Sequence, residues 1–197
     1  MTLVARLKVT LFDVEPQVLR RFDVPLKIQL NRLYDVIQAG IDWTDTYPYE
    51  FRAGGVGWGA SDPDGYYDGP LPANKYSLLD VVEDLGTKTI YDFGDNWHHV
   101  IKVEKIDDAI PGADYPRLVM AIGTFPPEDV GGFPGYADFV DAMADPKHEE
   151  HHRMLEWYGG MFDPEEAEID RILDNFERLA KTWTPKPCEP KAVPKPV

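Results

Sequence analysis

The sequence predicts an α+β fold, in which an antiparallel sheet from the N-terminal ~120 residues packs against helices that are mostly C-terminal. Two observations lead to this class. Over residues 5–11 apolar and polar side chains alternate, which is the period of a half-buried strand. Over residues 136–143 the apolar side chains instead recur at helical spacing. Strands therefore come first along the chain and helices later.

The first predicted elements are a β-hairpin and a helix. Residues 5–11 form the first strand and residues 18–24 the second, with a proline after each of them. Apolar residues at helical spacing then predict a helix over 29–39. Because glycine often supplies the left-handed residue that ends a helix, we expect this helix to stop at Gly40.

The middle of the chain combines short strands with turns. We expect a strand at Tyr49–Ala53, a long loop over 54–69, and a short helix that Ser77 caps at its N-terminus. Further strands are predicted at residues 87–92, 98–105 and 117–121. The first two of these form a hairpin that turns at Gly94.

Three helices are expected in the C-terminal part. The first contains residues 136–143, the second covers 148–157, and the third begins at Asp163-Pro164, because aspartate caps helices and proline is tolerated at the first helical position. Residues 182–197 are rich in proline and lysine and have no apolar period. We therefore expect one domain over residues 1–181, followed by a flexible tail.

Composition excludes several classes of partner. The chain has 197 residues with 35 Asp and Glu against 20 Lys and Arg, which gives a net charge of −15. Such an acidic protein is not expected to bind nucleic acid directly or to bind an anionic membrane, because both need clustered cations. A lone cysteine, Cys188, allows no internal disulfide, and no long apolar stretch is present. We therefore expect a soluble, cytoplasmic protein.

Two short segments are unusually dense in carboxylates, glycines and aromatic residues. Residues 91–99 read YDFGDNWHH, and residues 126–136 read PPEDVGGFPGY. In this order they resemble the plasmid pRiA4b ORF-3-like family, whose pattern is a Tyr-Asp-Phe-Gly-Asp hairpin followed by a Pro-Pro-Glu-Asp loop. The resemblance covers about residues 4–180 and includes Arg20-Arg21 and Trp43.

The resemblance implies a soluble prokaryotic protein of a family that occurs on plasmids and chromosomes and is associated with mobile elements. It implies no particular reaction, and the sequence does not support recombinase chemistry, because it lacks a basic surface and a serine in a nucleophile turn. Many relatives carry Cys or His where this chain has other residues. These positions are Leu118, Phe125, Tyr34, Tyr47 and Tyr49. A soft-metal site at these positions is therefore not expected.

The two segments supply a candidate functional cluster. Its members are Asp92, Asp95, Trp97, His99, Glu128 and Asp129. Because carboxylates and imidazoles bind divalent metals, the cofactor that these residues allow is a divalent metal such as Mn, Fe, Ni or Zn. The candidate ligands are His99, Asp95, Glu128, His148 and His151. A structural interpretation competes, in which the aspartates bind backbone amides of the hairpin turn and the tryptophan fills the core.

Two functions follow from these alternatives. The first is a binding or interaction module, whose strong negative charge attracts a basic protein partner. The second is a metal-dependent hydrolase, in which a metal held by the His and carboxylate residues activates water. We expect the binding module. The enzyme would require the hairpin and the Pro-Pro-Glu-Asp loop to meet in one concave site.

Overall fold

The structure, a computed structural model, confirms the α+β class. It describes residues 2–12, 14–44, 48–60, 69–82, 88–92 and 97–183, with the backbone alone for 88–92. The strands are β1 (Leu3–Leu11), β2 (Leu19–Pro25), β3 (Tyr49–Ala53), β4 (Val56–Gly59), β5 (Leu71–Pro72), β6 (Lys88–Asp92), β7 (His98–Asp108) and β8 (Arg117–Ile122). The helices are α1 (Leu30–Ile41), the 3-10 turn η1 (Ala73–Lys75), α2 (Leu78–Val81), α3 (Gly132–Ala144), α4 (His151–Tyr158) and α5 (Ile169–Trp183).

The strands form one sheet in the order β5-β4-β3-β6-β7-β1-β2-β8. All neighbours are antiparallel except β4 and β5. Strand β1 lies between β2 and β7 and shows the predicted alternation, since Leu7 and Val9 are fully buried while Arg6 and Lys8 are only partly covered. The N-terminal hairpin and the antiparallel pairing of β6 with β7 are confirmed, whereas the predicted turn at Gly94 lies outside the described residues.

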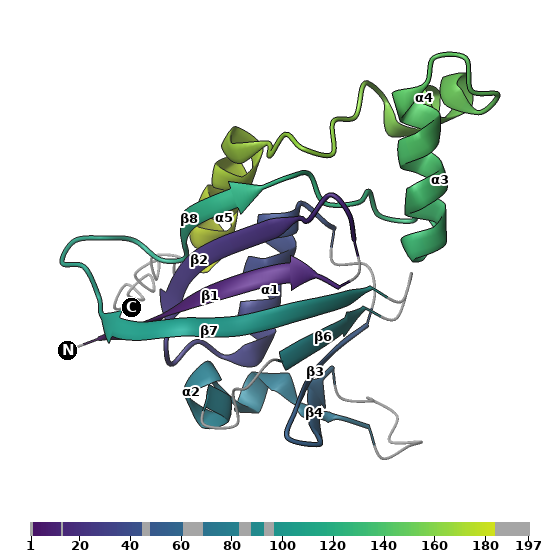
Figure 1. The fold of residues 1–197 in the computed structure, drawn as a ribbon. Helices are drawn as coiled ribbons and strands as arrows, with labels where there is room; N and C mark the ends of the chain where they lie inside the picture. The colour runs from purple at the N-terminus through teal and green to yellow at the C-terminus, as the bar shows by residue number, and fades with distance from the viewer. Residues whose placement is uncertain are drawn as a thin grey trace, which may run out of the picture.

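Helices α1 and α5 cover one face of the sheet (Figure 1). The ring of Phe22 on β2 meets the ring of Phe176 on α5 edge to face, with centroids 6.2 Å apart. Gly40 on α1 lies beside both rings, and a Cβ atom there would lie 3.6 Å from Phe22 and 3.7 Å from Phe176. These are ordinary van der Waals distances, so Gly40 lies where α1, α5 and the sheet meet.

Residues 132–162 form a helical arm that extends away from the sheet (Figure 1). Its own small core is built on Phe139, which is fully buried and touches three aromatic rings at centroid distances of 5.0–5.8 Å. These rings belong to Trp157, Tyr158 and Phe162. The arm is attached to the sheet by the segments 123–131 and 163–168.

The structure corrects the predicted end of α1. The helix continues through Gly40 to Ile41, and the left-handed residue is Asp42, with φ 65°. Arg20 on β2 donates a hydrogen bond to the Gly40 carbonyl at 2.8 Å, so a tertiary contact satisfies a carbonyl at this end of the helix. A pattern within the helix could not show that contact.

Two other boundaries were wrong. The predicted loop over 54–69 contains strand β4, which pairs with β3 after a turn at Gly54-Gly55. The third C-terminal helix begins at Ile169 and not at Asp163-Pro164. The Pro164 carbonyl instead accepts a hydrogen bond from the Thr124 amide at 3.0 Å, which ties this segment to the chain after β8.

In the part of the chain that the structure describes, no helix has the length and the apolar character needed to cross a membrane.

Candidate functional site

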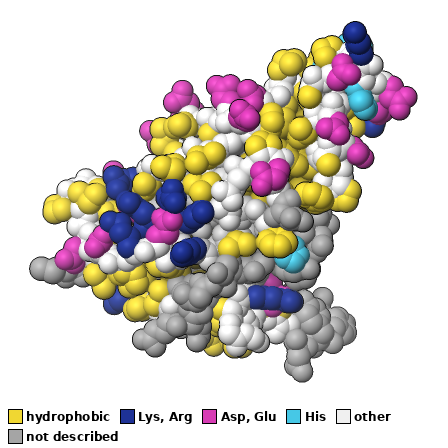
Figure 2. All heavy atoms as spheres, viewed as in Figure 1, with side chains coloured by type: hydrophobic (Ala, Val, Ile, Leu, Met, Phe, Trp, Pro, Cys, Tyr) yellow, Lys and Arg dark blue, Asp and Glu magenta, His cyan; other side chains and the backbone are white. Residues whose placement is uncertain are grey.

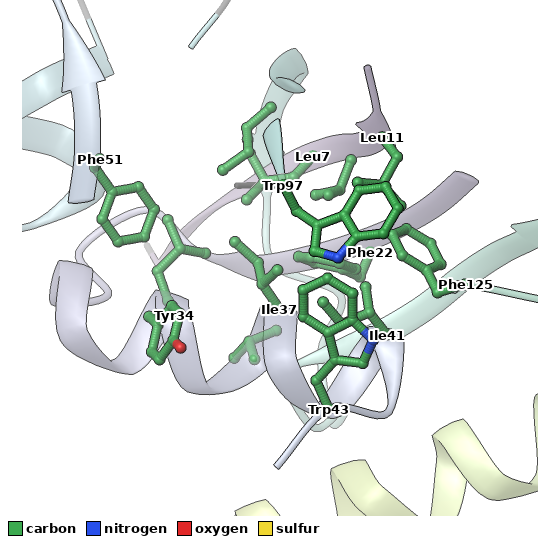
Figure 3. Close-up of a cluster of buried hydrophobic side chains, with 14 of the residues drawn as sticks. Leu7, Leu11, Phe22, Tyr34, Ile37, Ile41, Trp43, Phe51, Trp97 and Phe125 are labelled. Carbon is green, nitrogen blue, oxygen red and sulfur yellow. The ribbon is translucent and has the colours of Figure 1, made fainter. Parts of the chain in front are cut away.

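The hairpin segment enters the core. Trp97 is 3% exposed, and its ring lies 6.3 Å from the rings of both Trp43 and Tyr136. Figure 3 shows Trp97, Trp43 and Phe125 in one cluster with Phe22. The structural interpretation of Trp97 therefore agrees with its position, because it joins the start of β7 to the end of α1 and to α3.

His99 lies next to Trp97 in the same core. It pairs with Leu11 on β1, it is 1% exposed, and its ring stacks on Phe125 at a centroid distance of 6.1 Å. Neither ring nitrogen has a hydrogen-bond partner among the described residues. Burial, aided by the nearby charge of His98, lowers the pKa of His99 to about 3. The ring is therefore neutral at physiological pH.

The Pro-Pro-Glu-Asp loop lies directly beyond this core and is held there by Trp43. The indole Nε1 of Trp43 donates a hydrogen bond to the Pro126 carbonyl at 2.8 Å. Since His99 stacks on Phe125, the residue before Pro126, the structure does bring the two sequence segments side by side. They occupy different layers, however, because Trp97 and His99 are buried and the loop reaches the surface at Asp129.

The loop forms one wall of a cleft of about 230 Å³. Residues of three segments line it, namely the end of α1, the loop after β8, and the region of α4 and α5. They include Ile41, Asp42, Trp43 and Thr44, then Thr124, Phe125, Pro126, Pro127 and Glu128, and finally Tyr158, Glu168, Arg171 and Ile172. Arg20 lies at its base. We call this space the Trp43 cleft.

Arg20 is 3% exposed and has no carboxylate partner within salt-bridge distance in the described residues. Its Nε donates to the Gly40 carbonyl at 2.8 Å, and one terminal nitrogen donates to three further carbonyls. These belong to Leu19, Ile122 and Gly123, at 2.9, 3.0 and 2.9 Å. Burial lowers the pKa of Arg20 to about 10, although the charge of Asp42 opposes this. Arg20 thus joins β2, β8 and α1 beneath the cleft.

One side of the cleft carries a compensated group of charges. The Asp42 carboxylate accepts hydrogen bonds from the Asn175 amide at 2.7 Å and pairs with Arg171 at 2.7 Å. Arg171 also pairs with Glu168 at 3.2 Å. Although burial opposes it, the charges of Asp42 and Glu168 raise the pKa of Arg171. These groups hold α5 against the end of α1.

Glu128, on the opposite rim, has a different environment. Its Oε2 accepts a hydrogen bond from the Thr44 hydroxyl at 2.7 Å, and no cation pairs with it among the described residues. The carboxylate is only partly covered. Glu128 therefore presents an uncompensated negative charge beside Trp43 at the mouth of the cleft.

The other predicted site residues are separated from this place or lie outside the described residues. Asp129 is exposed and has φ 61°. His148 accepts a hydrogen bond from the Glu150 amide at 3.1 Å, and His151 Nδ1 lies 2.8 Å from the Ala142 carbonyl. Both histidines follow α3, whose 13 residues give it a length of about 20 Å, and they belong to the helical arm. Asp95 and the side chain of Asp92 lie outside the described residues.

Among the described residues, no three His, Cys, Asp or Glu side chains form a group that could hold a metal ion. Of the predicted ligands that the structure describes, only His99 and Glu128 belong to neighbouring segments, and His99 is enclosed by Trp43 and Phe125.

Sequence reasoning missed the contribution of Arg20, Asp42, Thr44 and Arg171. The sequence did contain one indication for Arg20. It lies on the same face of its strand as Phe22 and Val24, both of which are fully buried. An arginine in an apolar phase indicates a buried cation. No such signal exists for the pair of Asp42 and Arg171, which only the tertiary fold brings together.

The comparisons with known proteins decide the family. The sequence model described as plasmid pRiA4b ORF-3-like protein matches residues 3–171. The chain belongs to this family. It is 46% identical over 187 residues to the uncharacterized protein y4hQ of Sinorhizobium fredii. The alignment covers 93% of this chain and 95% of that protein. It also resembles the crystal structure of MM3350, a protein of unknown function from Methanosarcina mazei Go1, with a TM-score of 0.76 and 31% sequence identity. The match covers 85% of this chain and 96% of that chain.

Membership of the plasmid pRiA4b ORF-3-like family confirms the resemblance inferred from the two segments. The matched range contains every residue that lines the cleft except Ile172, from Arg20 to Arg171. In this plasmid pRiA4b ORF-3-like protein the Trp43 cleft is therefore built almost entirely from the region that matches the family.

Proposed function

We propose that the protein is a binding module whose Trp43 cleft receives a cationic side chain of a basic protein partner. The observation that carries this proposal is the Glu128 carboxylate, which lines the cleft, accepts a hydrogen bond from the Thr44 hydroxyl and pairs with no cation among the described residues. A lysine or arginine of a partner would supply the missing charge. The nearby face of Trp43 offers a second attraction for such a group.

The charge distribution along the chain supports a basic partner. Residues 128–171, which include the helical arm and one side of the cleft, contain thirteen Asp and Glu against three Lys and Arg. Most of the net charge of −15 therefore belongs to this segment. Such a local field raises the rate at which a basic surface meets the cleft and aligns it.

A peptide titration tests this function. A fluorescein-labelled lysine-rich peptide is titrated with the full chain, and binding is followed by fluorescence anisotropy. Glu128→Gln, which removes the charge but keeps the shape, should weaken binding roughly three- to tenfold. Asp108→Asn, a single-charge change at the far end of β7, is the control and should retain the wild-type affinity. The proposal is wrong if the wild-type protein does not bind, or if both variants bind equally.

The alternative function is the metal-dependent hydrolase that would use His99, Asp95, Glu128 and Asp129. It stays a prediction, since Asp95 lies outside the described residues. Thermal melts of the full chain with Mn, Ni or Zn, and with a chelator, distinguish it from the binding module. A metal that binds only the folded chain must raise its melting temperature.

We further propose that the protein acts in the cytoplasm as a single domain with a C-terminal tail. Helix α5 extends to Trp183, two residues beyond the predicted domain end at 181. The tail would be tested by repeating the peptide titration without residues 184–197. Its lysines would compete with the peptide for the acidic surface, so truncation would strengthen binding.

A further inference from the structure

The sheet face opposite α1 and α5 carries a cluster of cations in this acidic protein. Figure 2 shows Lys and Arg side chains gathered over β1, β2 and β7. The strand registers identify them, because directly paired residues lie on the same face. Lys8 is paired with Arg21 on one side and with Lys102 on the other. We call the five residues Arg6, Lys8, Arg21, Lys102 and Arg117 the basic sheet face.

The acidic residues of this face compensate only part of its charge. Asp23 receives two hydrogen bonds from Arg6, at 2.8 and 3.0 Å, and one from Arg117 at 2.9 Å. Burial opposes ionisation of Asp23, but these hydrogen bonds outweigh it and lower its pKa. Glu104 binds Arg21 through two bonds, at 2.9 and 3.0 Å. Asp107, which pairs with Lys105 at 2.6 Å, adds a weaker attraction for Arg6. The five cations thus outnumber the carboxylates close to them.

Lys8 and Lys102 form no salt bridge among the described residues, although the charge of Glu104 acts on both of them. They are neighbours on adjacent strands, and like charges in directly opposed positions repel each other. Lys102 is exposed and Lys8 is partly covered. Together with the three arginines they give this open face more positive than negative charge, which suits an interaction with an anionic group.

We propose that the basic sheet face binds an acidic segment of a partner protein, with carboxylates of the partner over Lys8 and Lys102. This surface is separate from the Trp43 cleft and has the opposite charge, so it goes beyond the proposed function. Adjacent strands are about 4.8 Å apart, so Lys102, Lys8 and Arg21 form a row of closely spaced donors. Successive Asp or Glu side chains of an extended or helical segment fit such a row.

The composition of the face favours protein over nucleic acid. Bases bind single-strand recognition surfaces mainly by stacking on aromatic rings. The side chains around the lysine pair include Thr10, Val100 and Met120, which are partly covered or exposed, and no aromatic residue is paired with Lys8 in either register. Among the described residues, the lysine pair therefore has charge and apolar contact beside it and no directly paired ring, while Phe12, which is 64% exposed, lies two residues beyond Thr10.

The experiment measures binding of a fluorescein-labelled glutamate-rich peptide to the full chain by anisotropy, together with thermal melts. Lys102→Glu should weaken binding at least about fivefold, because it places a carboxylate where the partner's carboxylate would lie. The same variant should raise the melting temperature, because it converts the repulsive pair with Lys8 into an attractive one. Lys147→Glu, the same charge change in the exposed turn after α3, should leave the affinity unchanged.

Each other outcome contradicts the proposal. Failure of the wild-type chain to bind the peptide at about 150 mM salt, or equal loss with both variants, would show only general charge attraction. Tighter binding of a thymidine oligonucleotide than of the peptide would assign the face to nucleic acid. If sedimentation shows that the wild-type chain forms dimers and that Lys102→Glu dissociates them, the basic sheet face would bind a second copy of this chain. The result with Lys102→Glu does not depend on Glu128. The proposals for the basic sheet face and for the Trp43 cleft can therefore be judged separately.

Discussion

Two segments of similar composition have opposite positions in this protein. The hairpin segment places Trp97 and His99 in the core, where they are 3% and 1% exposed. The Pro-Pro-Glu-Asp loop places Glu128 at the mouth of a cleft, where the Thr44 hydroxyl is its hydrogen-bond partner in the part of the chain that the structure describes. The comparison teaches that a dense motif of aromatic and acidic residues is not by itself a site. The layer in which the fold puts each side chain decides whether it supports structure or can meet a ligand.

Among the substitutions that test this comparison, we expect Trp97→Ala to change the stability most. Removal of a buried indole should lower the free energy of unfolding by about 3–5 kcal/mol, because it leaves a cavity between α1, α3 and β7. Urea unfolding of the full chain measures it. Trp157→Ala on the helical arm is the matched control, because this side chain is 48% exposed and should cost much less. Equal effects would contradict a core role for Trp97.

The next effect concerns pH and His99. Because burial lowers its pKa to about 3 in the fold, the unfolded chain takes up a proton below about pH 6.5 that the folded chain does not. The free energy of unfolding should therefore decrease as the pH is lowered. Between pH 7.5 and 5.0, His99 should account for about 2 kcal/mol of this decrease. His99→Leu should remove this part of the dependence.

Urea unfolding at the two pH values gives the result, with His152→Leu as the control at an exposed position. The same pH dependence in wild type and His99→Leu would mean that the His99 ring is accessible to protons in the fold. That result would return His99 to the candidate site residues.

The smallest effect is expected at the rim of the cleft. Thr44→Val removes the hydroxyl that holds Glu128 at 2.7 Å. Because this pair is exposed, the free energy of unfolding should change by less than about 1 kcal/mol. The lysine-rich peptide should bind roughly two- to threefold more weakly, since Glu128 loses its fixed position. A large loss of stability would show that the rim is structural, like the hairpin.

Local patterns were enough to predict much of the fold. The sequence predicted β3 at Tyr49–Ala53, and Ser77 with Asp80 forms the predicted start of α2, where the Asp80 carboxylate accepts bonds from the Ser77 amide and hydroxyl at 2.7 Å. Hydrogen bonds from Ser77 lower the pKa of Asp80. Such features depend on residues a few positions apart, so the sequence contains them.

Features that depend on distant contacts could not be predicted in this way. Helix α1 continues past Gly40 because Arg20 and Phe176 lie beside it, and α5 begins late because Pro164 bonds to Thr124. The site shows the same division. Glu128 was predicted from its own motif, whereas the arginine beneath the cleft and the ion pair along its side required the tertiary structure.

The most direct test of the account compares the indole signals of Trp43 and Trp97 by ¹H–¹⁵N NMR while the lysine-rich peptide is added to the full chain. The Trp43 Nε1–H bonds to the Pro126 carbonyl at the cleft, and the Trp97 indole lies in the core without a hydrogen-bond partner among the described residues. The account predicts that the Trp43 signal shifts with peptide and that the Trp97 signal stays in place. A Trp97 signal that moves while that of Trp43 does not would contradict it, and would assign recognition to the hairpin segment.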